Sequence, residues 1–233
     1  MSWSGAWALV PAKRFTTAKQ RLGGLLDAAG RATLACAMLD DLLALLAADT
    51  DLGGTLVVGE DPQARGLCRR HGAFFLAASD KDGLNDAVAR GAQALARRGA
   101  AAVLVVPSDL PGLRLADLAA LRAGLAGSDV ALVPAERDGG TNLLASRLPL
   151  GFAPVYGPAS FARHQAAAAA AGFSVAEPDC PGARADLDRP EDLPALIGCG
   201  PRTRSVLARF APGLLPGSLP PVASPVLIPT AAG

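Results

Sequence analysis

The sequence has few of the residues on which several common kinds of site depend. Its four cysteines are scattered, and no two of them form a CxxC pair. This spacing argues against a zinc site and a disulfide framework, and it is typical of a chain kept reduced in the cytoplasm. The two histidines, His71 and His164, lie far apart in the sequence without an obvious partner. A catalytic triad built on histidine is therefore not expected, and His71 is predicted at the surface, at the end of a helix.

Long apolar runs and an excess of charge of one sign are also missing. No run approaches the roughly 18 apolar residues of a membrane span. The apolar stretch near the N-terminus is short, and charges follow it instead of preceding it, unlike in a secretory signal. The 22 basic and 21 acidic residues leave a net charge of +1, which gives no drive toward nucleic acid or membrane.

The usual fingerprints of nucleotide-binding and hydrolytic sites are absent as well. There is no GxxxxGK(S/T) phosphate loop, no GxGxxG after the first predicted strand and no GxSxG elbow. These absences argue against P-loop enzymes, dinucleotide-binding proteins and serine hydrolases of the α/β type.

What the sequence does contain is a run of six apolar residues, Ala101 to Val106, which ends at Pro107. Such a run predicts a strand buried on both faces, at the centre of a parallel sheet. Asp109 follows at the carboxyl end of this strand, where open α/β sheets bind their ligands. An aspartate in this place can also cap the following helix, and this stretch alone leaves both roles open.

Strands and helices are predicted to alternate over the first part of the chain. The strands are expected at 7–10, 55–58, 73–76, 101–106 and 130–133, and the helices at 31–48, 61–71, 85–99 and 115–126. Asp61 is the predicted N-cap of the second helix, and Gly72 is predicted to end it. The alternation predicts an α/β fold with a doubly wound, mostly parallel sheet.

The character of the chain changes after Pro134. The next residues, 135–157, lack clean periodicity and predict a small inserted, partly β lobe that covers the sheet's edge. Further elements are expected as a helix at 158–171, an extended piece at 183–187 and a last helix at 191–197. These complete a predicted domain of residues 1–199, and residues 200–233 are expected to form a Pro/Ala-rich C-terminal tail with no assigned role.

A basic loop follows the first strand, with Lys13, Arg14, Lys19 and Arg21 within nine residues. It can be a solvated loop, or it can form an anion site, since the segment after the first strand of an α/β fold faces a bound ligand. In the second case its charges would offset the repulsion between two anions brought together for reaction.

The remaining candidate groups are three carboxylates, Asp109, Asp186 and Asp188. Two carboxylates brought together can hold Mg²⁺, which completes its shell with water and with phosphate oxygens of a substrate. Such a site suits nucleotidyl transfer, because a phosphate nucleophile is already ionised near neutral pH and needs no histidine base.

Six segments taken together resemble the CofC/FbiD family, the guanylyltransferases of coenzyme F420 biosynthesis. They occur in the family's order, and they are WALVPAKRFTTAKQRL at 7–22, DGLNDAVARGA at 82–92, VLVVPSDLPGL at 103–113, GGTNLLASR at 139–147, FAPVYGPASFARH at 152–164 and ADLDRPEDL at 185–193. PSDLP and DLDRPEDL occur in similar form in many nucleotidyltransferases, whereas GTN followed by GPASFARH is more specific.

The resemblance implies a Rossmann-like nucleotidyltransferase fold of the GT-A or MobA type and an enzyme of the EC 2.7.7 class. Such an enzyme joins GTP to a phosphorylated three-carbon acid and releases pyrophosphate. The acid is 2-phospho-L-lactate, phosphoenolpyruvate or 3-phospho-D-glycerate, and the guanylylated product goes to a downstream transferase. The implied enzyme is cytoplasmic, binds neither nucleic acid nor membrane, and is a monomer or a homodimer.

The resemblance also implies roles for single residues. Asp109 would bind Mg²⁺ together with Asp186 or Asp188. Contacts to the triphosphate, or to the phosphate of the acid, are implied for three cations of the basic loop, Lys13, Lys19 and Arg21. Gly83 and Asn85 would lie near guanine or ribose, although the same pair can simply form a turn and a helix cap.

Thr141, Gly157 and Ser160 would cradle the phosphorylated acid. Pro158 at the first helical turn predicts that free N–H groups of the helix it begins point toward this anion. For Ser160 the alternative is simple capping of the helix. One turn further on, His164 would either support the pocket from behind or lie on the surface of the helix.

Two departures from the family leave alternatives open. Many relatives carry GTGTN where this chain has DGGTN, so the identity of the acid is undecided. A molybdopterin guanylyltransferase or a sugar-phosphate nucleotidyltransferase would carry an LAGG-type loop after the first strand, where this chain has PAKRF. A non-catalytic nucleotide-binding protein of the same fold is the third alternative, and the retained carboxylates argue against it.

Overall fold

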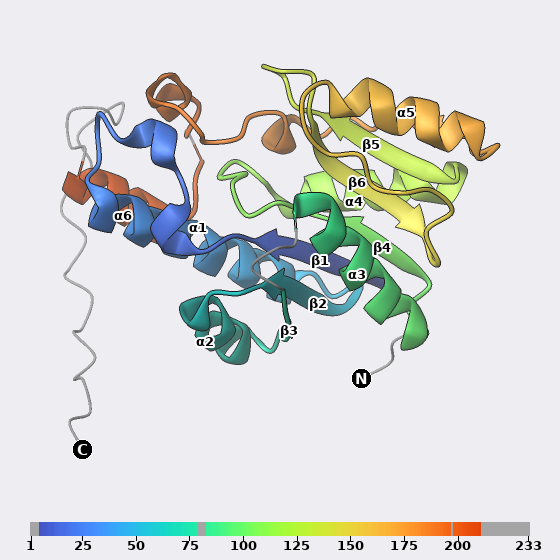
Figure 1. The fold of residues 1–233 in the computed structure, drawn as a ribbon, viewed down its shortest axis with the longest axis horizontal. Coiled ribbons are helices and arrows are strands. Elements are labelled where there is room, and N and C mark those ends of the chain that lie inside the picture. The colour runs from blue at the N-terminus through green and yellow to red at the C-terminus, as the bar shows by residue number, and fades with distance from the viewer. Residues whose placement is uncertain (1–4, 79–82, 197, 211–233) are drawn as a thin grey trace.

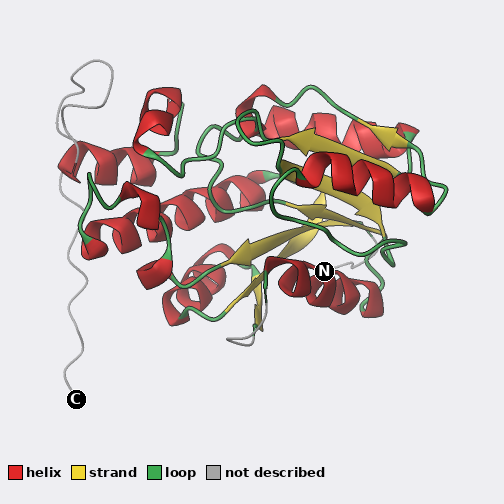
Figure 2. Ribbon diagram, turned by 45° about the horizontal axis from the view of Figure 1, so that its top comes forward, coloured by secondary structure: helices red, strands yellow, loops and turns green. Residues whose placement is uncertain are grey.

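The computed structural model describes residues 5–78, 83–196 and 198–210. In this part of the chain, strands form one sheet in the order β3-β2-β1-β4-β6-β5-β7, with helices on both of its faces (Figures 1 and 2). All of these strands run parallel except β6, which is antiparallel to β4 and to β5. The strands are β1 (Ala6–Ala12), β2 (Leu52–Gly59), β3 (Phe74–Ala77), β4 (Ala102–Val105), β5 (Val130–Pro134), β6 (Thr141–Arg147) and β7 (Val175–Ala176).

Helices connect and cover these strands. The α-helices are α1 (Ala28–Ala48), α2 (Pro62–His71), α3 (Leu84–Arg97), α4 (Leu115–Gly127), α5 (Ser160–Ala170) and α6 (Pro201–Phe210). Shorter 3₁₀ turns are η1 (Phe15–Thr17), η2 (Gln20–Leu22), η3 (Pro181–Ala183) and η4 (Pro190–Leu196). Among the described helices, none combines the length and the apolar character that crossing a membrane requires.

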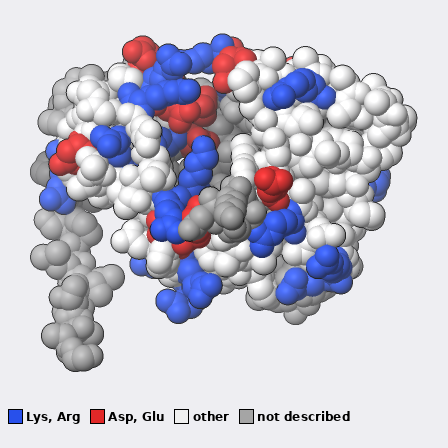
Figure 3. All heavy atoms as spheres, in the orientation of Figure 1, with Lys and Arg blue, Asp and Glu red and all other residues white. Residues whose placement is uncertain are grey.

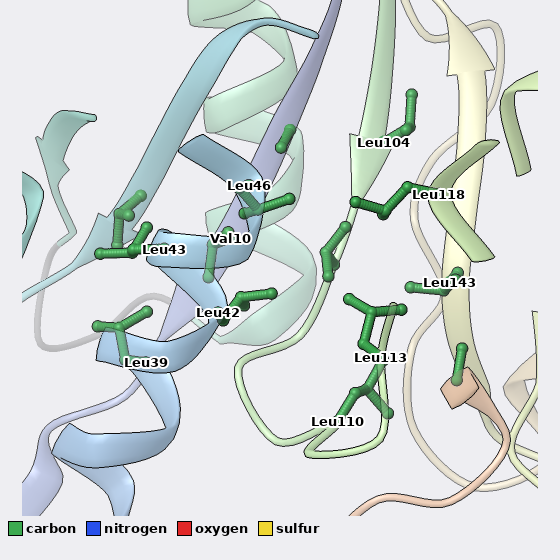
Figure 4. Close-up of a cluster of buried hydrophobic side chains, with 14 of the residues drawn as sticks. Val10, Leu39, Leu42, Leu43, Leu46, Leu104, Leu110, Leu113, Leu118 and Leu143 are labelled. Atoms are coloured by element: carbon green, nitrogen blue, oxygen red, sulfur yellow. The ribbon is translucent and has the colours of Figure 1, made fainter. Parts of the chain in front are cut away.

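The sheet separates two hydrophobic cores, because successive side chains of a strand point to opposite faces. On the central strand β1, Ala8 and Val10 face the core made with α1, α2 and α4, and Trp7 and Leu9 face the core made with α3 and α5. Figure 4 shows the first of these cores, in which leucines of α1 lie on the same side of the sheet as Val10. Helices cover both faces of the sheet, and in open α/β sheets of this kind ligands bind at the carboxyl edge.

The α/β class and the mostly parallel sheet predicted from the sequence are confirmed. The five predicted strands and the four helices between them are present, with their ends shifted. Asp61 caps α2, accepting a 2.8 Å hydrogen bond from the Gln63 N–H, and Gly72 ends the helix in the left-handed conformation at φ +70°. These local signals were readable because each is encoded within a few residues.

The segment that was expected to cover the sheet's edge instead forms an interior strand. β6 lies between β4 and β5 and is buried over almost its whole length. The chain reverses between β5 and β6 through a tight connection, in which Ala135 N–H donates to the Gly140 carbonyl at 2.9 Å and Gly139 takes φ +66°. Polar residues near the ends of β6, Thr141 and Ser146, leave only a short apolar centre, so the strand has no clean periodicity in the sequence.

The C-terminal part of the described chain differs from the prediction in two ways. The expected helix at 191–197 is a 3₁₀ turn, η4, and the extended piece at 183–187 is a loop. Beyond the predicted boundary at residue 199, the chain forms α6, which packs on α1 and contributes Leu207 to a core shared with Leu34 and Met38. Residues 211–233 of the predicted tail lie outside the described residues.

The packing of α6 predicts a measurable contribution to stability. Leu207 is 1% exposed, so Leu207→Ala is expected to lower the free energy of unfolding by about 2–5 kcal/mol. Ser205→Ala on the exposed side of the same helix serves as the control and should change it by less than about 0.5 kcal/mol. Urea unfolding of the two variants measures the difference, and equal midpoints would show that α6 does not contribute to the fold.

Candidate functional site

A cavity of about 620 Å³ opens at the carboxyl ends of β1, β2 and β4. The basic loop after β1 and the start of α3 form its walls, and the Pro107–Asp109 segment after β4 contributes Asp109. In Figure 3, Lys and Arg side chains border a hollow in which acidic side chains are visible. The cavity therefore lies where the sequence predicted ligand binding, and it is lined by charges of both signs.

Three carboxylates meet beside this cavity. Asp109, Asp186 and Asp188 each offer one oxygen, and these oxygens all lie within 4.8 Å of one another. The loop that carries the last two residues is tied to the first, since Leu187 N–H donates to the Asp109 carbonyl at 3.0 Å. Clustered carboxylate oxygens at this spacing fit a hard divalent cation such as Mg²⁺ or Mn²⁺.

Asp109 does not cap the following helix, so its alternative predicted role is wrong. α4 begins after Arg114, and the Arg114 N–H donates to the Asp117 carboxylate at 2.8 Å. The carboxylate of Asp109 instead accepts a hydrogen bond from Lys19, which lies ninety positions earlier in the chain.

Lys19 is the buried cation of this cluster. Its side chain is 7% exposed, and its ammonium lies 3.1 Å from Asp109 Oδ2 and 3.0 Å from Asp188 Oδ1. The residue takes the left-handed conformation, φ 55°, between η1 and η2, which is strained for a residue with a side chain. Burial alone would lower the pKa of Lys19, but the charges of Asp109 and Asp188 outweigh it and raise the pKa.

Arg21 and Lys13, the other two cations of the basic loop with an implied role, are placed differently. Arg21 lies 3.6 Å from Asp188 Oδ2 with a side chain 65% exposed, so solvent screens this pair. Lys13 lines the cavity. Asp61, the cap of α2, also holds the basic loop, because its Oδ2 accepts a 2.9 Å hydrogen bond from the Phe15 N–H.

The carboxylates of the cluster differ in their proton affinity. Burial would raise the pKa of Asp188, but Lys19 and then Arg21 outweigh this effect and hold the pKa below its usual range. Burial and the neighbouring charge of Asp109 raise the pKa of Asp186. A cluster of like charges needs a cation to stay ionised, and Lys19 supplies one in this structure.

Two residues that the sequence analysis did not select hold the acidic loop in place. Asn142 on β6 donates through Nδ2 to the Ala183 carbonyl at 2.7 Å. Asp192 accepts hydrogen bonds from the Asp188 N–H at 2.9 Å and the Arg189 N–H at 2.7 Å. The contact of Asn142 joins segments distant in sequence, so no local pattern reveals it. The contacts of Asp192 lie within DRPED, whose spacing is typical of such a turn.

Gly83 and Asn85 lie at the start of α3. Gly83 lines the cavity and is the N-cap of the helix. Asn85 bonds the backbone of Tyr156 through both ends of its side-chain amide, since Tyr156 N–H donates to Oδ1 at 2.6 Å and Nδ2 donates to the Tyr156 carbonyl at 3.3 Å. Asn85 therefore connects the wall of the cavity to the segment that leads to Gly157.

Thr141, Gly157 and Ser160 come together at the start of α5. Ser160 Oγ donates to Thr141 Oγ1 at 3.2 Å, and Ser160 N–H donates to the Gly157 carbonyl at 3.1 Å. The N–H groups predicted to be free are partly used, because Phe161 N–H also donates, to the Gly139 carbonyl at 3.0 Å. The helix begins at Ser160, two residues later than expected, so hydroxyl groups dominate this cluster.

His71 is more buried than predicted, and His164 takes the supporting place that was one of its two predicted alternatives. His71 ends α2 as predicted, but it is only partly exposed, because its Nε2 lies 2.5 Å from Asp40 Oδ1 and its side chain is 11% exposed. His164 is fully buried behind Thr141, with Nδ1 2.9 Å from Thr141 Oγ1, and Val155 N–H donates to its Nε2 at 3.0 Å. Both partners are distant in sequence, so no local pattern could have revealed them.

Burial of His164 predicts a loss of stability in mild acid. Burial, and then the charge of Arg163, lower the pKa of His164 to about 4, against an ordinary value of 6.5. Between these values the unfolded chain binds a proton that the native state does not, so stability falls by about 3 kcal/mol as the pH drops. Urea unfolding from pH 7 to pH 4.5 measures the loss, and His164→Phe should remove it. A wild-type curve flat over this window would contradict the assignment.

Comparison with known proteins gives a family and a fold. A family model described as guanylyl transferase CofC like matches residues 6–210. A phosphoenolpyruvate guanylyltransferase of Sphaerobacter thermophilus is 38% identical over 194 residues, covering 83% of this chain and 93% of the relative. A 3-phospho-D-glycerate guanylyltransferase of Phenylobacterium zucineum is 38% identical over 197 residues, covering 82% and 90%.

Solved structures similar to this one share its fold at low sequence identity. A protein from Desulfovibrio desulfuricans G20, assigned as a nucleotide-diphospho-sugar transferase, superposes with a TM-score of 0.66 at 20% identity, covering 90% of this chain and 87% of the other. CMP:2-keto-3-deoxy-manno-octonic acid synthetase, solved with CTP, gives a TM-score of 0.55 at 15% identity, covering 82% and 95%. These likenesses confirm the Rossmann-like nucleotidyltransferase fold.

Proposed function

Because the chain belongs to the family of CofC-like guanylyl transferases, we propose that it joins GTP to a phosphorylated three-carbon acid and releases pyrophosphate. The observation that carries the proposal is the cluster of Asp109, Asp186 and Asp188 around Lys19, beside a cavity at the carboxyl edge of the sheet. The proposed place of the reaction is coenzyme F420 biosynthesis in the cytoplasm, with a downstream transferase taking up the product.

The bond changes of the proposed reaction need no general base. A phosphate oxygen of the acid attacks the α-phosphorus of GTP, a new P–O bond forms, and the bond to the β-phosphate breaks. The attacking phosphate is already ionised near pH 7, so no proton has to be removed, and pyrophosphate leaves as an anion. The chain therefore contributes by holding the acid's phosphate in line with the α-phosphate of GTP and by offsetting the repulsion between these two anions.

The proposed roles of the residues follow from their charges. Asp109, Asp186 and Asp188 would hold Mg²⁺, which supplies charge neutralisation at the phosphates when bound. Cations of the basic loop would contact the triphosphate or the acid's phosphate, and they are Lys13, Lys19 and Arg21. The Lys19 ammonium is paired with Asp109 and Asp188 in this structure. A shift of the basic loop would bring this ammonium to a phosphate oxygen.

Two further groups of residues complete the proposed site. Gly83, in the cavity wall, and Asn85 are proposed to lie near guanine or ribose. Thr141, Gly157 and Ser160 are proposed to bind the phosphorylated acid, because the two hydroxyl groups lie within 3.2 Å of each other at the start of a helix. The double hydrogen bond between Asn85 and Tyr156 connects these two parts of the site.

A comparison of the three acids tests the proposed function. Pyrophosphate release is measured with GTP and 2-phospho-L-lactate, phosphoenolpyruvate or 3-phospho-D-glycerate, with the downstream transferase added in case the product is short-lived. Release with GTP and one of the acids is expected, and ATP and CTP should react at least about ten-fold more slowly. Silence with all three acids would overturn the proposal, and equal rates with ATP or CTP would refute the assigned base preference.

A further inference from the structure

We infer that His164 is a positioning residue, which orients the Thr141–Ser160 hydroxyl pair so that the pair presents a hydrogen-bond donor to the phosphorylated acid. This inference rests on the proposed function, because it takes the acid to bind at Thr141 and Ser160. The transfer chemistry does not need this buried histidine. The inference assigns it a role in recognising the substrate.

The neighbours of His164 determine which ring nitrogen carries the proton. The Val155 N–H is a backbone donor with a fixed direction, so the His164 Nε2 that it reaches at 3.0 Å must accept. A neutral ring with an unprotonated Nε2 carries its hydrogen on Nδ1. Full burial keeps the ring neutral at pH 7, and Nδ1–H therefore donates to Thr141 Oγ1 at 2.9 Å.

This donation sets the direction of the next hydrogen bonds. With one lone pair of Thr141 Oγ1 taken by His164, the hydroxyls of Thr141 and Ser160 share a single hydrogen bond of 3.2 Å. Two hydroxyls carry two hydrogens, and one of them is used in that bond. Whichever hydroxyl donates, one hydrogen of the pair remains for a further acceptor. The opposite tautomer would accept a hydrogen from Thr141 and draw it into the protein.

The remaining hydrogen of the Thr141–Ser160 pair is available to a ligand, whereas neighbouring backbone donors are not. Two backbone N–H groups at the start of α5 are already occupied, since those of Ser160 and Phe161 donate to backbone carbonyls. Directly before Ser160 in the chain, Gly157, Pro158 and Ala159 are exposed, and within the pair Thr141 keeps 7% exposure and Ser160 1%. An anion that approaches Thr141 past these exposed residues would meet a hydroxyl hydrogen already oriented by a buried ring, so little reorganisation would be needed.

Nitrogen NMR on the full chain tests the tautomer without any substrate. Labelling histidine with ¹⁵N gives signals from two rings, because the sequence has two histidines, and those missing in His164→Asn belong to His164. We expect a protonated Nδ1 and an unprotonated Nε2 at pH 7. A proton on Nε2, or a charged ring, would overturn the inference, and the tautomer itself is read from the signals of the wild-type chain.

Kinetics of two matched variants test the consequence. The side-chain amide of His164→Asn reaches the place of Nδ1 and keeps a donor for Thr141, whereas that of His164→Gln lies nearer Nε2 and loses it. We expect His164→Gln to raise the KM for the acid about ten-fold or more and to leave the KM for GTP within about two-fold, while His164→Asn stays near the wild type. Equal effects of the two variants, or equal effects on both KM values, would indicate a merely structural role and overturn the inference.

The two proposals fail in different ways. If the wild-type chain transfers to none of the three acids, the proposed function fails, and the NMR result still decides the tautomer. If the wild type transfers but the Asn and Gln variants do not differ in the KM for the acid, the function stands and the role of His164 falls.

Discussion

Asp109→Asn is expected to reduce guanylyl transfer by about 10³-fold while leaving the chain folded. The substitution removes one of three carboxylates that meet within 4.8 Å, and with it one of the two ionic partners of Lys19. The side chain of Asp109 is 30% exposed and caps no helix, and Lys19 keeps Asp188 as an ionic partner, so the chain is expected to stay folded. Pyrophosphate release measures the activity, and circular dichroism confirms the fold.

A matched control separates this effect from a general loss of negative charge. Asp179 pairs with Arg184 at the surface with a side chain 82% exposed, so Asp179→Asn should keep wild-type activity. If Asp109→Asn kept more than about a tenth of the wild-type rate, the carboxylate would have no essential part in holding the metal.

Lys19→Met is expected to move activity and metal affinity in opposite directions. Its ammonium lies about 3 Å from oxygens of both Asp109 and Asp188, where it competes with any cation for the same carboxylates. Without it, Mn²⁺ should bind at least about ten-fold more tightly in the absence of nucleotide, because a buried repulsion is removed. Transfer should fall by about 10²-fold or more, because a cation at the phosphates is lost.

Electron paramagnetic resonance of Mn²⁺ and pyrophosphate release measure the two effects on the same samples. Arg21→Met is the graded control, since its guanidinium lies 3.6 Å from Asp188 Oδ2 but is largely exposed, and its effect on Mn²⁺ affinity should be smaller. Unchanged or weaker Mn²⁺ binding by Lys19→Met would contradict the competition between the ammonium and the metal.

The parts of the fold that the sequence predicted are those encoded locally. The buried run before Pro107 and the Asp61–Gly72 signals of α2 each lie within one element, and the structure confirms them. The prediction for β6 was wrong because the polar ends of this strand indicate an exposed segment. Its pairing with β4 and β5, which places it inside the sheet, cannot be read from the strand itself. α6 was not predicted because its short apolar face is buried only by packing on α1.

The candidate site shows the same division. The carboxylates Asp109, Asp186 and Asp188 could be selected because strand ends and acidic motifs can be read from the chain, and the structure brings them together. The tie from Asn142 to Ala183 could not be selected, because it depends on a contact between segments distant in sequence, whereas the place of His164 behind Thr141 matches one of its two predicted alternatives.

A crystal structure with Mn²⁺ and a non-hydrolysable GTP analogue tests the central claim most directly, since anomalous scattering locates the metal without assumptions. We predict a peak about 2.1 Å from carboxylate oxygens of Asp109 and of Asp186 or Asp188, with the Lys19 ammonium moved from these carboxylates to the phosphates. A metal bound elsewhere, with Lys19 still paired to Asp109 and Asp188, would contradict the account.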